Sequence, residues 1–226
     1  MDEAIALNER NIAELAKTAG FRRGGTMVDL GCGDGALTVR LARDLEPESV
    51  SVVEVFDPHV RAATGRGFTV AEADLNAHLP FPADSFDLVV SNQVIEHLYD
   101  TDLFVAENAR IAKPGGLVIV STENASSWHN IGALVLGWQA FSLTNVSGLA
   151  AGVGNPLALR RGDEGWPFPM QHHRIFSLRG LIELGTLHGL QLVRALGAGY
   201  HPLPPSVGRL DATHAHFITI AFRKPE

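Results

Sequence analysis

The segment Asp29-Leu-Gly-Cys-Gly-Asp-Gly35 carries the residues whose types and spacing most clearly suggest chemistry. The apolar run before it predicts a buried parallel strand over 27–30, and the residues from Ala36 onward predict a helix. Glycine at such a strand-to-helix turn tolerates positive φ and lets a ligand approach the backbone. The helix N-terminus that follows offers free N–H groups to a carboxylate or phosphate. The pattern therefore predicts a cofactor site that includes Gly31 and Gly33.

Two cofactors fit this turn, and Asp29 discriminates between them. The pattern Gly31-x-Gly33-x-x-Ala36 also satisfies the dinucleotide fingerprint, and a tight turn without any ligand would produce it as well. Asp29 lies at the carboxyl end of the strand, where ligands of α/β proteins bind. Its carboxylate would repel a pyrophosphate but would pair with a cationic amino-acid group. The segment therefore resembles the glycine-rich loop of class I S-adenosylmethionine (SAM) dependent methyltransferases.

The resemblance extends from about Val28 to Asn124. It includes Leu79-Pro-Phe-Pro-Ala-Asp-Ser-Phe-Asp-Leu-Val-Val-Ser91, Asn92-Gln-Val-Ile-Glu-His-Leu98 and Lys113-Pro-Gly-Gly116, in the order of the type-11 methyltransferase domain and the ubiquinone-biosynthesis O-methyltransferases. It implies methyl transfer from SAM to a small-molecule acceptor, more often at oxygen than at nitrogen or carbon, with S-adenosylhomocysteine as product. A SAM-binding subunit without turnover remains an alternative. An NAD-dependent oxidoreductase is another, although the chain has no room for the usual separate substrate domain.

Two acids end the second expected strand, 49–56, and both could accept the ribose hydroxyls of a bound nucleoside. Asp57 precedes Pro58, and Asp-Pro is typical of a helix N-cap followed by proline in the first turn. We therefore assign the ribose to Glu54 and the cap to Asp57, with Asp57 kept as the alternative ribose ligand.

Three further residues complete the expected cofactor set. In the resembled family an acid after the third strand holds the adenine amino group, and the backbone of the next residue faces the ring. Asp74 and Leu75 occupy those positions, although an ordinary exposed turn would also explain Asp74. Asn92, at the end of the fourth strand, is the third candidate.

Histidine is the usual base when a hydroxyl acceptor must lose its proton. His97 follows the fourth strand, and His129 and His172 lie near the ends of a long segment, so these three are the candidate bases. A satisfied structural histidine is the alternative for each. His214 and His216 alternate along an expected strand and could bind a metal, but no carboxylate stands at a recognisable spacing, so we expect no metal site.

The long segment is 125–176, which is rich in glycine, leucine and aromatic residues and contains all three tryptophans. It predicts a helix over 126–138 and a loop over 145–165. A connection of this length is usually functional, so we expect a lid and acceptor pocket, with a contact in a homodimer as the alternative.

These residues need a sheet to position them. The alternation of strands and helices predicts one domain over 1–226, a doubly wound Rossmann-like α/β sheet of seven strands with the last strand antiparallel. The remaining expected elements are helices over 2–17, 101–111 and 178–188, and strands over 68–71, 86–91, 117–122, 191–196 and 216–223. Ser177 is the expected N-cap of the last helix.

Composition narrows the possible partners. The net charge is −7 and the basic residues are scattered, which argues against a nucleic-acid groove. No apolar run reaches the length of a membrane span. The single cysteine, Cys32, fits a reducing cytosol and is expected to pack within the glycine loop. The acidic start, Met1-Asp-Glu-Ala, makes an export signal unexpected, so we expect a cytoplasmic protein.

Overall fold

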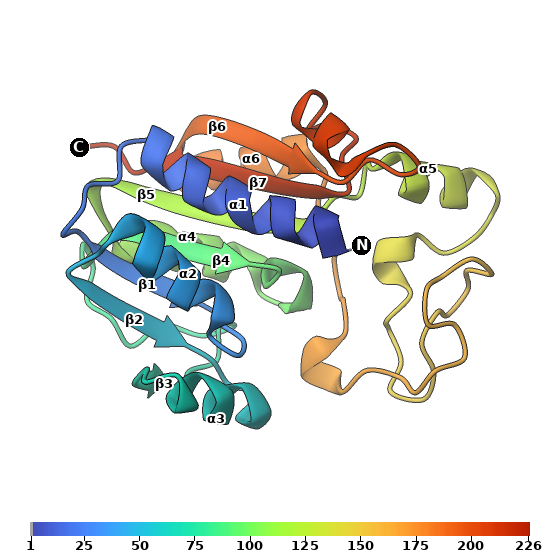
Figure 1. Ribbon diagram of the computed structural model, residues 1–226, viewed down its shortest axis with the longest axis horizontal. Helices are drawn as coiled ribbons and strands as arrows, with labels where there is room; N and C mark the ends of the chain where they lie inside the picture. Colours follow the sequence, from blue (N-terminus) through green and yellow to red (C-terminus); the bar gives the residue numbers. More distant parts are fainter. Residues whose placement is uncertain (1) are drawn as a thin grey trace.

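The computed structural model describes residues 2–226, and a seven-stranded sheet runs through its centre (Figure 1). The strand order is β3-β2-β1-β4-β5-β7-β6. The strands β1 to β5 pair in parallel, whereas β7 is antiparallel to both of its neighbours. The strands are β1 Thr26–Leu30, β2 Ser49–Val53, β3 Val70–Ala71, β4 Phe86–Asn92, β5 Ala112–Glu123, β6 Gln191–Ala198 and β7 Phe217–Arg223. The expected seven-stranded doubly wound sheet is confirmed.

Helices cover both faces of this sheet (Figure 1). They are α1 Asp2–Thr18, α2 Ala36–Leu45, α3 Asp57–Gly65, α4 Thr101–Ile111, α5 Trp128–Val135 and α6 Leu178–Leu187, with 3₁₀ turns η1 Ile95–His97, η2 Phe141–Leu143, η3 Phe168–Met170 and η4 Pro205–Arg209. Side chains alternate between the faces of a strand, so Met27 packs with α1 and α2 while Val28 packs with α4 and α6. The two apolar layers hold the strand ends in register, and those ends carry the site.

The second strand ends earlier than its β-branched sequence suggests. It was expected to reach Phe56 but stops at Val53. The cause is Glu54, whose Oε1 accepts hydrogen bonds from the backbone N–H groups of Val55 and Phe56 at 2.8 and 3.0 Å. These N–H groups bind a side chain instead of a neighbouring strand, so the ladder cannot continue.

The expected N-cap at Asp57 is wrong. Asp57 is the first residue of α3, Phe56 holds the N-cap position, and no side chain caps the helix there. At α6 the expectation is confirmed, because Ser177 accepts a hydrogen bond from the N–H of Gly180 at 3.2 Å. The strand β5 begins at Ala112 rather than at Leu117, since Ala112 already pairs with Phe86 across an irregular register.

The connection between β5 and α6 lies beyond the carboxyl ends of the parallel strands (Figure 1). Its helix α5 stops at Val135 rather than at Trp138, because Gly137 adopts a left-handed φ of 74°. Residues 145–165 form neither helix nor strand, as expected. Within residues 2–226, no helix combines the length and apolar character needed to cross a membrane.

Candidate functional site

The glycine loop follows β1 in a conformation that side chains disfavour. Gly31 and Gly33 have φ values of 74° and 57°. A Cβ atom on Gly31 would lie 2.6 Å from Cγ2 of Val94, whereas a Cβ atom on Gly33 would meet nothing within 4 Å. Glycine is therefore required at 31 by packing as well as by the backbone, and at 33 the main chain is open to a ligand.

Asp29 lies buried beneath this loop with one carboxylate oxygen unused. Its side chain is 1% exposed, and Oδ2 accepts a hydrogen bond from the hydroxyl of Thr38 at 2.6 Å. No group bonds Oδ1. Burial raises the pKa of Asp29 to about 6, against the Thr38 hydrogen bond and with a smaller contribution from the charge of Glu54. A buried acceptor without a partner is costly, and a cationic donor would satisfy it.

Glu54 joins the glycine loop to the end of β2. Its Oε2 accepts a hydrogen bond from the N–H of Gly33 at 2.9 Å, in addition to the two N–H groups that Oε1 accepts. The imidazole Nδ1 of His59 lies 3.7 Å from Oε2. Each carboxylate oxygen can accept more than one hydrogen bond, so hydroxyl groups of a ligand can still bind here.

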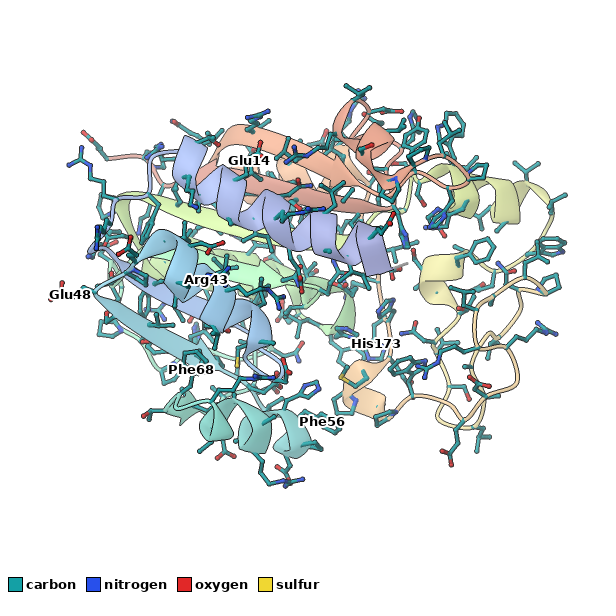
Figure 2. All side chains as sticks on the ribbon, in the orientation of Figure 1. Glu14, Arg43, Glu48, Phe56, Phe68 and His173 are labelled. Atoms are coloured by element: carbon teal, nitrogen blue, oxygen red, sulfur yellow. The ribbon has the colours of Figure 1, made fainter. Side chains whose placement is uncertain are left out.

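A cavity of about 320 Å³ opens at this edge of the sheet, and we call it the first cavity. Among the expected cofactor residues it is lined by Gly31, Glu54, Asp74 and Leu75, and not by Asp29, Gly33, Asp57 or Asn92. Its other lining residues are largely apolar or aromatic and come from the turn after β2 and the start of α3, from the loop after β3, from residues 93–99 and from the segment before α6. Figure 2 labels two of the lining side chains, Phe56 just before α3 and His173 in the segment before α6.

Asp74 is exposed, and its Oδ1 accepts hydrogen bonds from the backbone and side-chain nitrogens of Asn76 at 2.8 and 2.9 Å. Leu75 is buried against the cavity floor. Asn92 ends β4, and its Oδ1 accepts a hydrogen bond at 2.9 Å from Asn8 of α1. The side-chain oxygen of Asn8 in turn accepts hydrogen bonds from hydroxyls of β5 and β7, so α1 fixes this amide.

The structure brings together two of the three candidate bases. His97 lines the first cavity, and its ring centroid lies 4.7 Å from that of His172. The Nδ1 atoms of these rings bond the carbonyl oxygens of Gln171 and Ser142 at 3.0 and 2.7 Å. A carbonyl oxygen only accepts, so Nδ1 carries the proton and Nε2 is free to take one. Burial lowers the pKa of His97, which favours the neutral form that a base needs.

The third candidate, His129, lies in a second cavity of about 510 Å³ with Glu123, His201 and His216. Burial lowers its pKa to about 4. His214 does not join His216 there, because its Nδ1 bonds a carboxylate oxygen of Asp211 at 2.8 Å. The pair considered as metal ligands therefore has separate neighbours.

The fold agrees with what comparison with known proteins shows. A family model described as a methyltransferase domain matches residues 2–195. The chain belongs to this methyltransferase family. The ubiquinone biosynthesis O-methyltransferase of Brucella anthropi is 27% identical over 205 residues, which cover 87% of this chain and 72% of the relative. The protein of the same name from Bradyrhizobium sp. is 31% identical over 145 residues, which cover 60% of this chain and 53% of the relative.

Solved structures share the fold. A SAM-dependent methyltransferase of Thermotoga maritima, described as a possible histamine N-methyltransferase, superposes with a TM-score of 0.62 at 21% identity, covering 96% of this chain and 92% of that one. A SAM-dependent methyltransferase from Mesorhizobium loti gives 0.60 at 17% identity, covering 96% and 98%. Together with the family model and the relatives above, this makes the chain a SAM-dependent methyltransferase.

The residues present fit that cofactor. The unpartnered Oδ1 of Asp29 is a buried acceptor for an ammonium group, and the open main chain at Gly33 lets a ligand lie against the loop. The apolar floor at Leu75 suits a planar base. The sequence predicted Asp29 and the glycine loop as parts of a cofactor site, and it predicted the backbone of Leu75 rather than its side chain. It did not predict the Thr38 hydroxyl that bonds Asp29.

The carboxyl group of Glu96 lies near the candidate bases and was not predicted from the sequence. Glu96 is fully buried, its Oε2 accepts a hydrogen bond from the hydroxyl of Thr122 at 2.8 Å, and its Oε1 has no partner. Burial raises its pKa to about 7, and the nearby His172 opposes that shift. Glu96, His97 and His172 each offer a ligand atom within 4.8 Å of the others, an arrangement that could hold a metal ion. The sequence did not predict this cluster because Glu96 and His172 lie far apart in the chain.

Proposed function

We propose that this methyltransferase methylates an oxygen atom of a small-molecule acceptor, with the Nε2 atom of His97 or His172 as the base. The observation that supports this is the pair of adjacent rings, of which His97 lines the first cavity and His172 packs against it, each with its Nδ1–H held by a carbonyl. The relatives named as ubiquinone biosynthesis O-methyltransferases favour oxygen over nitrogen. His129 remains the third candidate and lies in the second cavity.

We propose that the cofactor lies along the carboxyl ends of β1, β2 and β4. Asp29 would accept the amino group, Glu54 the ribose hydroxyls, and Asp74 with the backbone of Leu75 the adenine. The main chain of Gly31 and Gly33 would face the cofactor, and Asn92 would lie beside it at the end of β4. Glu54 is preferred over Asp57 for the ribose because Glu54 lines the first cavity and Asp57 does not.

When bound, SAM supplies a methyl group on a sulfonium, which is already activated for displacement. The protein must bring the acceptor oxygen in line with that group and remove its proton. The free Nε2 would accept the hydroxyl proton of the acceptor, and the sulfur of SAM would leave as S-adenosylhomocysteine. The carbonyls of Gln171 and Ser142 keep each ring in the orientation that exposes this nitrogen.

We also propose that segment 125–176 forms the lid and acceptor pocket. Its support is that Phe168 and Met170 line the first cavity, while Phe141 and Leu157 line the second. The alternative is a homodimer contact, because Val135 at the end of α5 is 80% exposed. Sedimentation of the protein with and without SAM distinguishes a monomer from a dimer.

The net charge of −7 supports a small molecule over a nucleic acid as the acceptor. The buried position of the single cysteine is compatible with the proposed cytoplasmic location.

The test supplies SAM labelled in its methyl group and a pool of cellular small molecules below about 1 kDa, and it separates labelled products by chromatography. We expect His97→Ala or His172→Ala to lower kcat by about 10²–10⁴-fold with little change in SAM affinity. The control is His188→Ala, because His188 pairs with Asp102 away from both cavities. Binding of SAM without any labelled product from the wild type would indicate a SAM-binding subunit instead, and preferential binding of NAD in calorimetry would contradict both.

A further inference from the structure

The second cavity has a composition that no part of the cofactor site explains. Its lining residues are one acid, three histidines, two hydroxyl side chains and an apolar wall, and none of them is lysine or arginine: Glu123, His129, Phe141, Ser142, Thr144, Leu157, Leu159, His201 and His216. The volume of about 510 Å³ lies in the range of small-molecule sites. The cavity is therefore large enough to hold a small molecule, and its side chains indicate which kind would fit.

The second cavity adjoins the proposed catalytic histidines through Glu123. This residue ends β5, the strand next to β4, and lines the second cavity. Its Oε2 lies 3.9 Å from Nδ1 of His172, and the ring of His172 lies 4.7 Å from that of His97 in the first cavity. Glu123, His172 and His97 thus form a row of neighbouring side chains between the second cavity and the first.

Two buried polar atoms on this wall, one of Glu123 and one of His216, have no hydrogen-bond partner within residues 2–226. Oε2 of Glu123 is buried without a hydrogen bond, because Nδ1 of His172 gives its proton to the carbonyl of Ser142. Nδ1 of His216 is also buried, and none of the described residues 2–226 bonds it. Burial lowers the pKa values of His129 and His216, so both rings are neutral at physiological pH and each can accept a hydrogen bond. The wall therefore offers acceptors that need donors.

We propose that the methyl acceptor binds in the second cavity as an uncharged hydroxyl compound, with one hydroxyl donating a hydrogen bond to the Glu123 carboxylate and the histidine rings accepting from others. This inference rests on the proposed function and adds the location, the contact residues and the charge of the acceptor. An acceptor with a carboxylate would meet Glu123 without a lysine or arginine among the lining residues to compensate, so it is disfavoured.

The binding test uses catechol and 3,4-dihydroxybenzoate, which carry the same pair of hydroxyls and differ by one carboxylate. Their affinities are measured by ligand-observed NMR on the full chain with S-adenosylhomocysteine present. We expect catechol to bind at least about tenfold more tightly than the benzoate, and Glu123→Gln to weaken catechol by about tenfold while reducing that preference. S-adenosylhomocysteine affinity should stay unchanged, which shows that the variant is folded.

A matched pair of variants tests the location. Leu157 lines the second cavity yet is 66% exposed, so Leu157→Trp fills the cavity without disturbing the core. Leu149 lies in the same loop, is 92% exposed and does not line the cavity, so Leu149→Trp is the control. We expect only Leu157→Trp to abolish catechol binding and the transfer of labelled methyl to the small-molecule pool.

The outcomes separate the two proposals. If Leu157→Trp still transfers labelled methyl to the pool, the acceptor lies elsewhere and this inference fails while the proposed function stands. Absence of catechol binding to the wild type, or tighter binding of the benzoate, overturns the uncharged hydroxyl class. A wild type that binds SAM but labels nothing overturns the proposed function and this inference with it.

Discussion

Replacing Asp29 by asparagine should change both the pH dependence of folding and the affinity for SAM. The pKa of this buried carboxyl rises from 3.8 to about 6. The folded state therefore holds the proton more tightly than the unfolded chain does, so stability is greatest below pH 4 and falls as pH rises toward 6. One pKa unit corresponds to about 1.4 kcal/mol, so this group alone should cost the cofactor-free protein about 3 kcal/mol by pH 7.

The Asp29→Asn variant keeps an oxygen for the Thr38 hydroxyl and removes the titration. The wild type should thus lose about 2.4 kcal/mol more than the variant between pH 4 and pH 7, measured by urea unfolding without SAM. Comparing the two proteins cancels the contribution of Glu96, whose pKa is also raised. At pH 7 the variant should bind SAM about 10–100-fold more weakly by calorimetry, because a neutral amide replaces the partner of an ammonium group.

Equal pH dependence in the two proteins would show that burial does not perturb Asp29 as described. Unchanged SAM affinity would show that Oδ1 does not face the amino group of the cofactor, even if the pH dependence behaves as expected.

Three further predictions concern the glycine loop and the turn after β2 that it contacts. Glu54→Ala should weaken SAM binding by about 1–3 kcal/mol and also lower the melting temperature, because it leaves three backbone N–H groups without an acceptor. Asp57→Ala should have neither effect, and the reverse result in calorimetry would reassign the ribose to Asp57. Gly31→Ala should destabilise the fold more than Gly33→Ala in urea unfolding, because only the former meets a side chain, and equal losses would contradict this packing argument. Burial raises the pKa of Cys32 to about 12, so Ellman's reagent should react with it at pH 8 only after unfolding, and rapid labelling of the native protein would refute this protection.

Local patterns predicted the parts of the site that lie within one strand and its following turn. Asp29 and Gly31 belong to a single strand-turn-helix unit, so their proximity follows from the alternation of a strand and the geometry of the turn. Glu54 was chosen over Asp57 from a capping argument that proved wrong at Asp57, although the choice itself is the one that the first cavity favours.

The second cavity could not be predicted in the same way. Glu123, His129, His201 and His216 come from the end of β5, from α5, from the loop after β6 and from the residue before β7. No periodicity links such distant segments, and their meeting depends on β7 inserting between β5 and β6. The hydrogen bond between Asn8 and Asn92 could not be predicted either, because it requires α1 to lie across the end of β4.

The three N–H groups bound by Glu54 have a consequence for how quickly the cofactor can bind. They tie the glycine loop to the turn after β2, so the main-chain geometry at Gly33 is set when the chain folds and not when a ligand arrives. A site whose backbone is already ordered loses little conformational entropy on association. Cofactor association should then be a single-step encounter without a slow rearrangement of the loop, and any slow phase in binding would originate in the segment between β5 and α6.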